Sequence, residues 1–277
     1  MTLPKLSERE ELKAAMRAAR ASALTVAARR AFAPGLVLVV VLILWEVVVR
    51  SFDIPTYLVP APSVVLRTMS GNSDSLASDA LVTLVEAALG FTLGAGFAFV
   101  LGAAFVRWQA IERGMGPLII ALQAVPIVAS APLLIIWFGN GLLSKVIMAA
   151  LICFFPMVVN TTVGLRSVER EALDLMKLLK ATQLQVFWKL RVPAALPFLF
   201  SGLRISATLS VIGAVVAELA GATKGIGFQI MVSSYRTDTP LLFSAVIFSA
   251  LTGLFFFGLI VLLERLVVGR RGADREI

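Results

Sequence analysis

Several apolar runs, each about as long as a bilayer-spanning helix, constrain this sequence more than any other feature. The 277 residues are 59% hydrophobic and only 15% charged, whereas soluble domains carry about 25% charged residues. A membrane helix needs roughly 20 apolar residues. We therefore predict an all-α membrane protein with six spans, at 31–49, 80–106, 117–138, 142–165, 196–221 and 241–263.

Prolines and glycines punctuate these runs. The prolines between positions 55 and 62 exclude a continuous helix after the first span. The polar residues 71–79 predict a loop before the second span. Gly90 and Gly94 form a small-residue face that lets another helix approach closely. Prolines inside the third and fourth spans predict kinks.

The distribution of lysine and arginine predicts the orientation. Most of these residues fall in the N-terminal tail, the 107–113 connection, the 166–191 loop and the tail after position 263. The alternate loops hold only Arg50, Arg67, Lys145, Lys224 and Arg236. Because cytoplasmic loops carry the excess of these residues, both termini are expected to be cytoplasmic. The expected parts are an N-terminal tail at 1–30, a transmembrane domain at 31–266 with a loop at 166–195, and a C-terminal tail at 267–277.

Composition also excludes several classes of function. The chain has no histidine and one cysteine, Cys153, so an intrachain disulfide, a Cys/His metal site and a histidine-dependent triad are excluded. We expect Cys153 to be a small buried apolar residue. The net charge of +8 is spread between the spans rather than gathered in one basic groove, which argues against nucleic-acid binding. The N-terminal tail either lies along the lipid headgroups or is a frayed tail, and the first run is expected to stay as a membrane helix.

The 166–195 loop has an amphipathic pattern of its own. Glu171, Asp174, Lys177 and Lys180 recur at intervals of three, and leucine and methionine fill the positions between them. This pattern predicts a short helix with one polar stripe. A second apolar cluster around Trp188 follows, and prolines are expected to end it and start the fifth span. The pattern by itself leaves two alternatives open, a helix lying flat on the membrane and a docking site for a soluble protein.

The same loop resembles the cytoplasmic loop of permease subunits in bacterial ABC importers that use a binding protein. That motif reads Glu-Ala-Ala, three residues, Gly, nine residues, Ile, one residue, Leu-Pro. With Pro193 at the proline, Asp174 takes the acidic position and Lys180 takes the glycine. Lysine resists the positive φ that glycine allows there, so either the docking geometry differs locally or the next two residues carry the turn. The segments 58–65, 139–145 and 215–230 also resemble the family, which extends the likeness over about 36–266.

The resemblance implies a division of labour. The permease, paired with itself, forms the pathway, two copies of a separate ATPase bind the loops, and a periplasmic or lipid-anchored binding protein delivers the substrate. No Gly-x-x-x-x-Gly-Lys-[Ser/Thr] motif is present, so this chain is not expected to hydrolyse ATP or to hold a cofactor. Location in the bacterial inner membrane is implied as well. The residues implied in coupling are Glu171, Asp174, Lys177, Lys180, Thr182, Gln183, Phe187, Trp188 and Pro193.

Polar residues within the spans are the other candidates, because ionisable groups there are costly. Glu218, Glu86 and Gln123 are the predicted pathway residues, although helix-end or interhelical hydrogen bonding explains them as well. Glu46 is placed near the outer face. For Arg204, snorkelling to the cytoplasmic surface is preferred over pairing with a carboxylate.

Two rival functions stay open at this point, a stand-alone secondary carrier or channel and a membrane scaffold. Paired broken helices with charges at mid-membrane would favour the carrier, and no such repeat is present in the sequence. The substrate is expected to be a small organic solute. A pyrimidine-like or riboflavin-like molecule is preferred over a sulfonate, taurine or nitrate.

Overall fold

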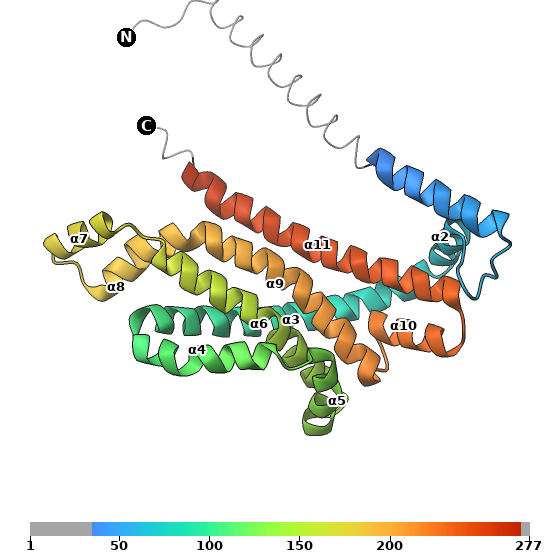
Figure 1. The fold of residues 1–277 in the computed structure, drawn as a ribbon, viewed down its shortest axis with the longest axis horizontal. Coiled ribbons are helices and arrows are strands. Elements are labelled where there is room, and N and C mark those ends of the chain that lie inside the picture. The colour runs from blue at the N-terminus through green and yellow to red at the C-terminus, as the bar shows by residue number, and fades with distance from the viewer. Residues whose placement is uncertain (1–34, 273–277) are drawn as a thin grey trace, which may run out of the picture. The chain divides into compact units, whose positions relative to one another are not determined.

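The computed structural model describes residues 35–272, which are helical throughout apart from turns and short connections and contain no strand. Contacts divide the chain after Val64 into two units, which are described separately. Predicted features that lie in 1–34 or 273–277, including the N-terminal tail, fall outside the described residues. Figure 1 shows the helices with their labels.

The first unit consists of a helix over residues 35–51 followed by turns. The helix ends before Pro55, so the predicted break at the prolines is confirmed. Glu46 projects from this helix, and its carboxylate accepts hydrogen bonds from the Ser63 backbone N–H at 2.9 Å and the Ser63 hydroxyl at 2.7 Å. The carboxylate thereby pairs a backbone N–H in the first turn of α2 (Pro62–Gly71), which begins in this unit.

The second unit contains the long helices. In chain order after α2 these are α3 (Ser73–Arg107), α4 (Gln109–Gln123), α5 (Ile127–Phe138), α6 (Leu142–Arg166), α7 (Arg170–Leu178), α8 (Gln183–Val186), the π-helical turn η1 (Phe187–Arg191), α9 (Val192–Gly221), α10 (Ile226–Tyr235) and α11 (Thr239–Gly272).

Four helical stretches in the described residues are long and apolar enough to cross a membrane. They are α3, α6, the continuous stretch Gln183–Gly221 and α11, and the bent pair of α4 and α5 gives a fifth if it counts as one span. These stretches are those of a multi-pass helical membrane protein. The first predicted span begins before the described residues, so the count of six stays a prediction.

Glycines set the distance between the three central helices. A Cβ atom added at Gly94 of α3 would lie 2.4 Å from the Ala150 carbonyl oxygen of α6, and one at Gly213 of α9 would lie 2.8 Å from the Ala149 Cα. Real Cβ atoms are not found this close to backbone atoms, so only glycine permits the approach. The predicted small-residue face at Gly90 and Gly94 is confirmed, and its partner is α6.

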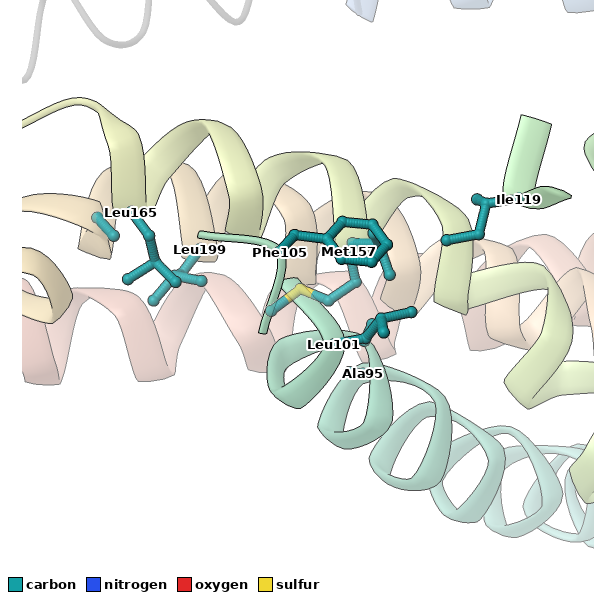
Figure 2. Close-up of a cluster of buried hydrophobic side chains, with 10 residues drawn as sticks. Ala95, Leu101, Phe105, Ile119, Met157, Leu165 and Leu199 are labelled. Atoms are coloured by element: carbon teal, nitrogen blue, oxygen red, sulfur yellow. The ribbon is translucent and has the colours of Figure 1, made fainter. Parts of the chain in front are cut away.

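Apolar side chains fill the space between α3, α4, α6 and α9. Figure 2 shows Leu101 and Phe105 of α3 grouped with Met157 of α6, all of them buried. Ala95, Leu165, Ile119 of α4 and Leu199 of α9 are the other labelled members of this cluster. This packing holds α4 beside α3, where Figure 1 also places it.

Two predicted boundaries are wrong. Residues 71–79 do not form a loop, because α3 already begins at Ser73 and its polar first two turns extend the helix beyond the apolar run. The predicted third span at 117–138 starts too late, because α4 already begins at Gln109, whereas the kink predicted from its prolines is confirmed by the 100° angle between α4 and α5. Pro126 stands at the break and cannot donate the backbone hydrogen bond that would continue α4.

The glycine contact can be tested with two single-methyl changes on one helix. Gly94→Ala places a Cβ against the α6 backbone and should destabilise the fold by about 1–3 kcal/mol. Gly96→Ala is the matched control, because nothing lies within 4 Å of its added Cβ. The midpoint of thermal unfolding in detergent should fall for Gly94→Ala and stay level or rise for Gly96→Ala. Equal midpoints would contradict the assigned contact.

Candidate functional site

The first group of candidate residues lies on α7, which no other part of the described chain covers. None of its residues is buried. Two of its three leucines are strongly exposed, Leu175 at 56% and Leu178 at 81%, whereas Leu173 is half-buried. Lys177 pairs with Asp174 at 2.7 Å on the polar side, and both side chains are largely exposed, so this pair contributes little stability. A helix with a bare apolar face and little internal support fits a surface that another molecule covers.

Lys180 forms the turn that ends α7. Its φ is +52°, so lysine adopts the conformation that it was expected to resist, and the alternative in which the next two residues carry the turn is wrong. The Ala181 N–H donates to the Met176 carbonyl at 3.0 Å and the Lys180 N–H to the Lys177 carbonyl at 2.9 Å. These two bonds are those of a Schellman C-cap, with Lys180 at the position that glycine usually occupies.

The next turn starts a new helix at once. Thr182 is the N-cap of α8, and its hydroxyl accepts from the Gln185 N–H while the Gln185 side chain accepts from the Thr182 N–H. This capping box fixes the angle between α7 and α8. Residues 170–191 therefore form a short helical hairpin, which Figure 1 shows at the opposite end of α9 from α10.

The aromatic residues anchor this hairpin at its base. Phe187 is partly buried against the apolar cluster of α3, α6 and α9 and lies 6.5 Å from the Phe99 ring, measured between centroids. Trp188 packs edge-on against Phe187 but is 56% exposed. Phe187 thus fixes the hairpin to the bundle, and Trp188 stays available for contact.

Pro193 lies in the first turn of α9, as predicted for the start of the fifth span, but it does not end the apolar cluster before it. The chain runs without a break from Gln183 to Gly221, and η1 immediately precedes the proline. In that wide turn the Val192 N–H donates to the Phe187 carbonyl. Since proline has no N–H to continue the ordinary pattern, the widened turn accommodates it.

A polar cluster lies at the other end of α9, around Glu218. Glu218 is fully buried. One carboxylate oxygen accepts from the Thr83 hydroxyl at 2.7 Å and the other from the Gly227 N–H at 2.5 Å. The Ile226 N–H in turn donates to the Thr83 hydroxyl oxygen at 2.9 Å. A carboxylate at a helix N-terminus is favourable, so Glu218 ties α10 to α9 and α3.

Glycine is required where this cluster is tightest. Gly225 has a φ of +104°, and its N–H donates to the Asp79 carboxylate at 3.0 Å. A Cβ there would lie 2.3 Å from a Glu218 carboxylate oxygen. The loop between α9 and α10 can therefore close over Glu218 only with a residue that has no side chain.

Glu86 and Lys145 extend the cluster. Glu86 of α3 is buried, interacts with Glu218, and has one carboxylate oxygen without a hydrogen-bond partner. The buried Lys145 donates to the backbone carbonyls of Asn140 and Gly141 at 2.9 and 3.0 Å and lies within electrostatic reach of both glutamates. Three ionisable groups from α3, α6 and α9 thus share one site.

Gln123 lies apart from this cluster. It is the last residue of α4 and is exposed at the bend. The three predicted pathway residues are therefore split into a buried pair and a separate amide. Sequence reasoning missed Thr83 and Asp79, which lie one turn apart on α3 and carry no local signal. The glycine pair at 225 and 227 beside Glu218 was the signal that could have indicated a carboxylate under a tight loop.

The structure also tests the predictions made for Arg204 and Cys153. Arg204 of α9 lies 3.5 Å from the Glu264 carboxylate of α11, so the expectation that it snorkels rather than pairs is wrong. The sequence offered no way to choose between them, because the partner is sixty residues away on another helix. Cys153 is buried between α3 and α6, as predicted.

Replacing the lysine at the α7 cap tests the strained turn. An L-residue in the left-handed conformation costs roughly 1–2 kcal/mol, so Lys180→Gly should stabilise the hairpin by about 1 kcal/mol. Lys177→Gly is the matched control, because the same change inside α7 should destabilise it by a similar amount. Hydrogen exchange of the α7 amides should slow in the first variant and quicken in the second. Faster exchange of the α7 amides in Lys180→Gly would contradict the assignment of Lys180 to the left-handed position of a Schellman C-cap.

Replacing Glu218 tests whether its buried carboxylate fixes the start of α10. Glu218→Ala leaves the Gly227 N–H without its acceptor, and an unpaired buried group costs about 1–3 kcal/mol. The Thr83 hydroxyl also loses Glu218 and keeps only the Asp79 carbonyl at 3.1 Å as an acceptor. Amides at the start of α10 should exchange faster, and the unfolding midpoint should fall. Leu219→Ala, the neighbouring and more exposed position, is the control and should leave α10 exchange unchanged. Unchanged α10 exchange in Glu218→Ala would refute this role.

Comparison with known proteins identifies similar chains. Residues 90–269 match the family model of the binding-protein-dependent transport system inner membrane component. The riboflavin transport system permease protein RibX of Chloroflexus aurantiacus is 39% identical over 83% of this chain and 87% of its own length. The formylaminopyrimidine transport permease protein ThiX of Halalkalibacterium halodurans is 33% identical over 86% and 96%. The putative aliphatic sulfonates transport permease protein SsuC of Bacillus subtilis is 33% identical over 83% and 85%.

Proposed function

This chain belongs to the inner membrane components of binding-protein-dependent transport systems. From that premise we propose how it couples to an ATPase, how its pathway opens and which class of substrate it carries. It is the membrane permease subunit of an ABC importer and not an enzyme, since ATP hydrolysis is carried by a separate subunit. The single observation that carries the proposal is the helical hairpin at 170–191, whose apolar face is bare.

The proposed topology has six spans with both termini in the cytoplasm. The charge distribution supports it, because the hairpin and the α3–α4 connection are rich in arginine and lysine, whereas the α9–α10 end is not. The helix over residues 35–51 would supply the first span and the bent pair α4–α5 the third. The hairpin then faces the cytoplasm and the Glu218 cluster faces outward.

The hairpin is proposed to dock in a groove of the ATPase. Leu175, Leu178 and Trp188 offer exposed apolar contacts, and Glu171, Asp174 and Lys177 supply a polar edge. Lys180 sets the angle of the hairpin through the C-cap of α7, and Thr182 does so through its capping box with Gln185. Gln183, the exposed first residue of α8, adds to the polar edge, while Phe187 and Pro193 join the hairpin to the bundle. ATP binding closes two ATPase copies, and each hairpin moves with its groove. The rigid connection through η1 into α9 passes that motion to the spans.

Two copies of the permease are proposed to enclose the pathway. The exposed apolar face of α5, which includes Val128, Ile136 and Trp137, supports a second copy or lipid beside it, and a two-fold pair fits the usual symmetry of membrane and soluble dimers. A binding protein outside the membrane would deliver substrate to this pair. The alternating access that follows needs different contacts in the two states.

Glu218 and Glu86 are proposed to act at the outer end of the pathway. Their burial under α10 fits a role in holding that helix as a gate in the conformation described, and an open gate would bring them to the pathway. Gln123 would lie on the pathway side of the α4–α5 bend. These assignments rest on placement in the fold together with the cost of buried carboxylates.

The proposed substrate is a planar heteroaromatic solute, pyrimidine-like or riboflavin-like. Two of the relatives reported above are named for riboflavin and formylaminopyrimidine transport, which supports this choice. Others are named for aliphatic sulfonates, taurine and nitrate, and these are the competing substrates. Binding measurements on the cognate binding protein with one solute of each class would decide between them.

Reconstitution with the partner ATPase tests the coupling. Asp174→Ala and Trp188→Ala remove exposed side chains, so the fold should persist, while loss of an interface tryptophan typically costs about 2 kcal/mol or more of binding. Both variants should lose most of the transport-linked stimulation of ATPase activity in proteoliposomes. Lys189→Ala, next to Trp188 and also exposed, is the control and should keep it.

The wild-type chain supplies the reference for this test. It should co-purify with the ATPase in a two-to-two complex. Normal stimulation in both variants would remove the coupling role from the hairpin, and recovery of the wild-type chain without any ATPase would refute the proposed partnership.

A further inference from the structure

A basic pocket lies where the ends of α3 and α6, the start of α4 and the turn η1 meet. Its cavity volume is about 360 Å³. Of the hairpin at 170–191 only its last residue, Arg191, contributes to the pocket, and no residue of the Glu218 cluster does. Its lining residues are Val106, Gln109, Glu112, Arg113, Arg166 and Arg191.

The pocket carries an excess of positive charge. Three guanidinium groups, from Arg113, Arg166 and Arg191, face one carboxylate. Arg166 binds that carboxylate with both of its terminal nitrogens, at 2.8 Å and 2.5 Å from the two Glu112 oxygens. This pair uses up the only negative charge among the lining residues. Glu112 also attracts the Arg113 guanidinium, but one carboxylate cannot compensate three cations, so the lining keeps an excess of two positive charges (three arginines less one glutamate).

Backbone contacts hold the arginines in place. Arg191 donates to the Leu165 carbonyl at 2.8 Å, which fixes one edge of its guanidinium group. Arg166 also reaches the Phe105 carbonyl at 3.4 Å. The two guanidinium groups are close enough to repel one another. Keeping like charges together costs free energy unless an anion lies between them, so the pocket is preorganised for an anion.

We infer that this pocket binds a phosphate group, carried either by the headgroup of an anionic phospholipid or by a free phosphate anion. Guanidinium groups fit phosphate because their donors form a planar fork that matches two of its oxygens. A singly charged phosphate diester would compensate much of the excess charge. Its oxygens would receive the free edges of Arg113 and Arg191.

The surroundings favour the phospholipid as the source. Trp108 is 53% exposed beside the pocket, and the Arg107 guanidinium lies 5.7 Å from its ring centroid. Exposed tryptophan next to arginine is typical of the level of the lipid headgroups, and basic pockets between spans on the cytoplasmic side bind anionic headgroups. The placement of the pocket at the level of the lipid headgroups rests on the orientation proposed above, whereas the excess of positive charge in the pocket does not depend on that orientation.

Native mass spectrometry of the full chain in a neutral detergent tests the inference. The probes are phosphatidylglycerol, phosphatidylcholine and inorganic phosphate, each added separately and then in competition. Arg113→Gln should weaken phosphatidylglycerol binding about five-fold, the effect of one cation near an anionic headgroup. Lys189→Gln is the matched control, because it removes one exposed charge from η1 outside the pocket and should leave binding unchanged.

A second variant changes binding in the opposite direction. Glu112→Gln removes the only negative charge of the lining while keeping a side chain that can accept from Arg166. Binding of phosphatidylglycerol should strengthen, again by about five-fold. Because misfolding does not increase affinity, this result would support the pocket even if Arg113→Gln proved unstable.

The possible outcomes separate the sources of the phosphate. Selective retention of phosphatidylglycerol, not displaced by inorganic phosphate, assigns the site to the lipid. Displacement by inorganic phosphate at similar concentration assigns it to the free anion. Equal effects of Arg113→Gln and Lys189→Gln on every probe would overturn the inference. So would a loss of ATPase association in Arg113→Gln without any change in binding of the three probes, since the pocket would then be a protein contact. None of these readouts depends on transport activity.

Discussion

The close approach of α6 to both α3 and α9 is the constraint on which the rest of the second unit depends. Lipid offers no hydrophobic driving force for helix association, so packing must supply it. Glycines remove the Cβ atoms that would otherwise separate the backbones, as at Gly94 and Gly213. The three helices then form one rigid body, and the apolar cluster at Phe105 and Met157 fills the space that remains.

The two ends of this rigid body make different connections to the rest of the chain. At one end, α9 continues without interruption into η1 and α8, so any force on the hairpin acts directly on a span. At the other end, the Glu218 carboxylate accepts hydrogen bonds from Thr83 of α3 and Gly227 of α10, and the Ile226 N–H donates to the Thr83 hydroxyl, so α9, α3 and α10 are joined. A helix with both ends tied in this way fits the proposed coupling, in which the hairpin receives the motion of the ATPase and the Glu218 end controls access.

The spans were predictable because their signal is local. Hydropathy identified α3, α6, α9 and α11, since every turn of such a helix must be apolar to face lipid or neighbouring spans. The prolines predicted a kink in the third span, but its size of 100° could not be predicted, because prolines also lie inside α5 and α6 without breaking them. The amphipathic pattern of α7 was likewise readable, whereas the left-handed Lys180 was not, since its conformation is imposed by the two helices it joins.

The sequence by itself determined that this chain is a helical membrane protein with a basic amphipathic loop, and its motif spacing determined the family. Only the tertiary structure decided which buried groups meet. Glu218 finds Thr83 more than a hundred residues away, Arg204 finds Glu264, and Glu86 comes to lie beside Glu218. Local patterns cannot specify such pairs, because each depends on helix rotation and close approach, and these are fixed only when all the contacts along the glycine faces form together.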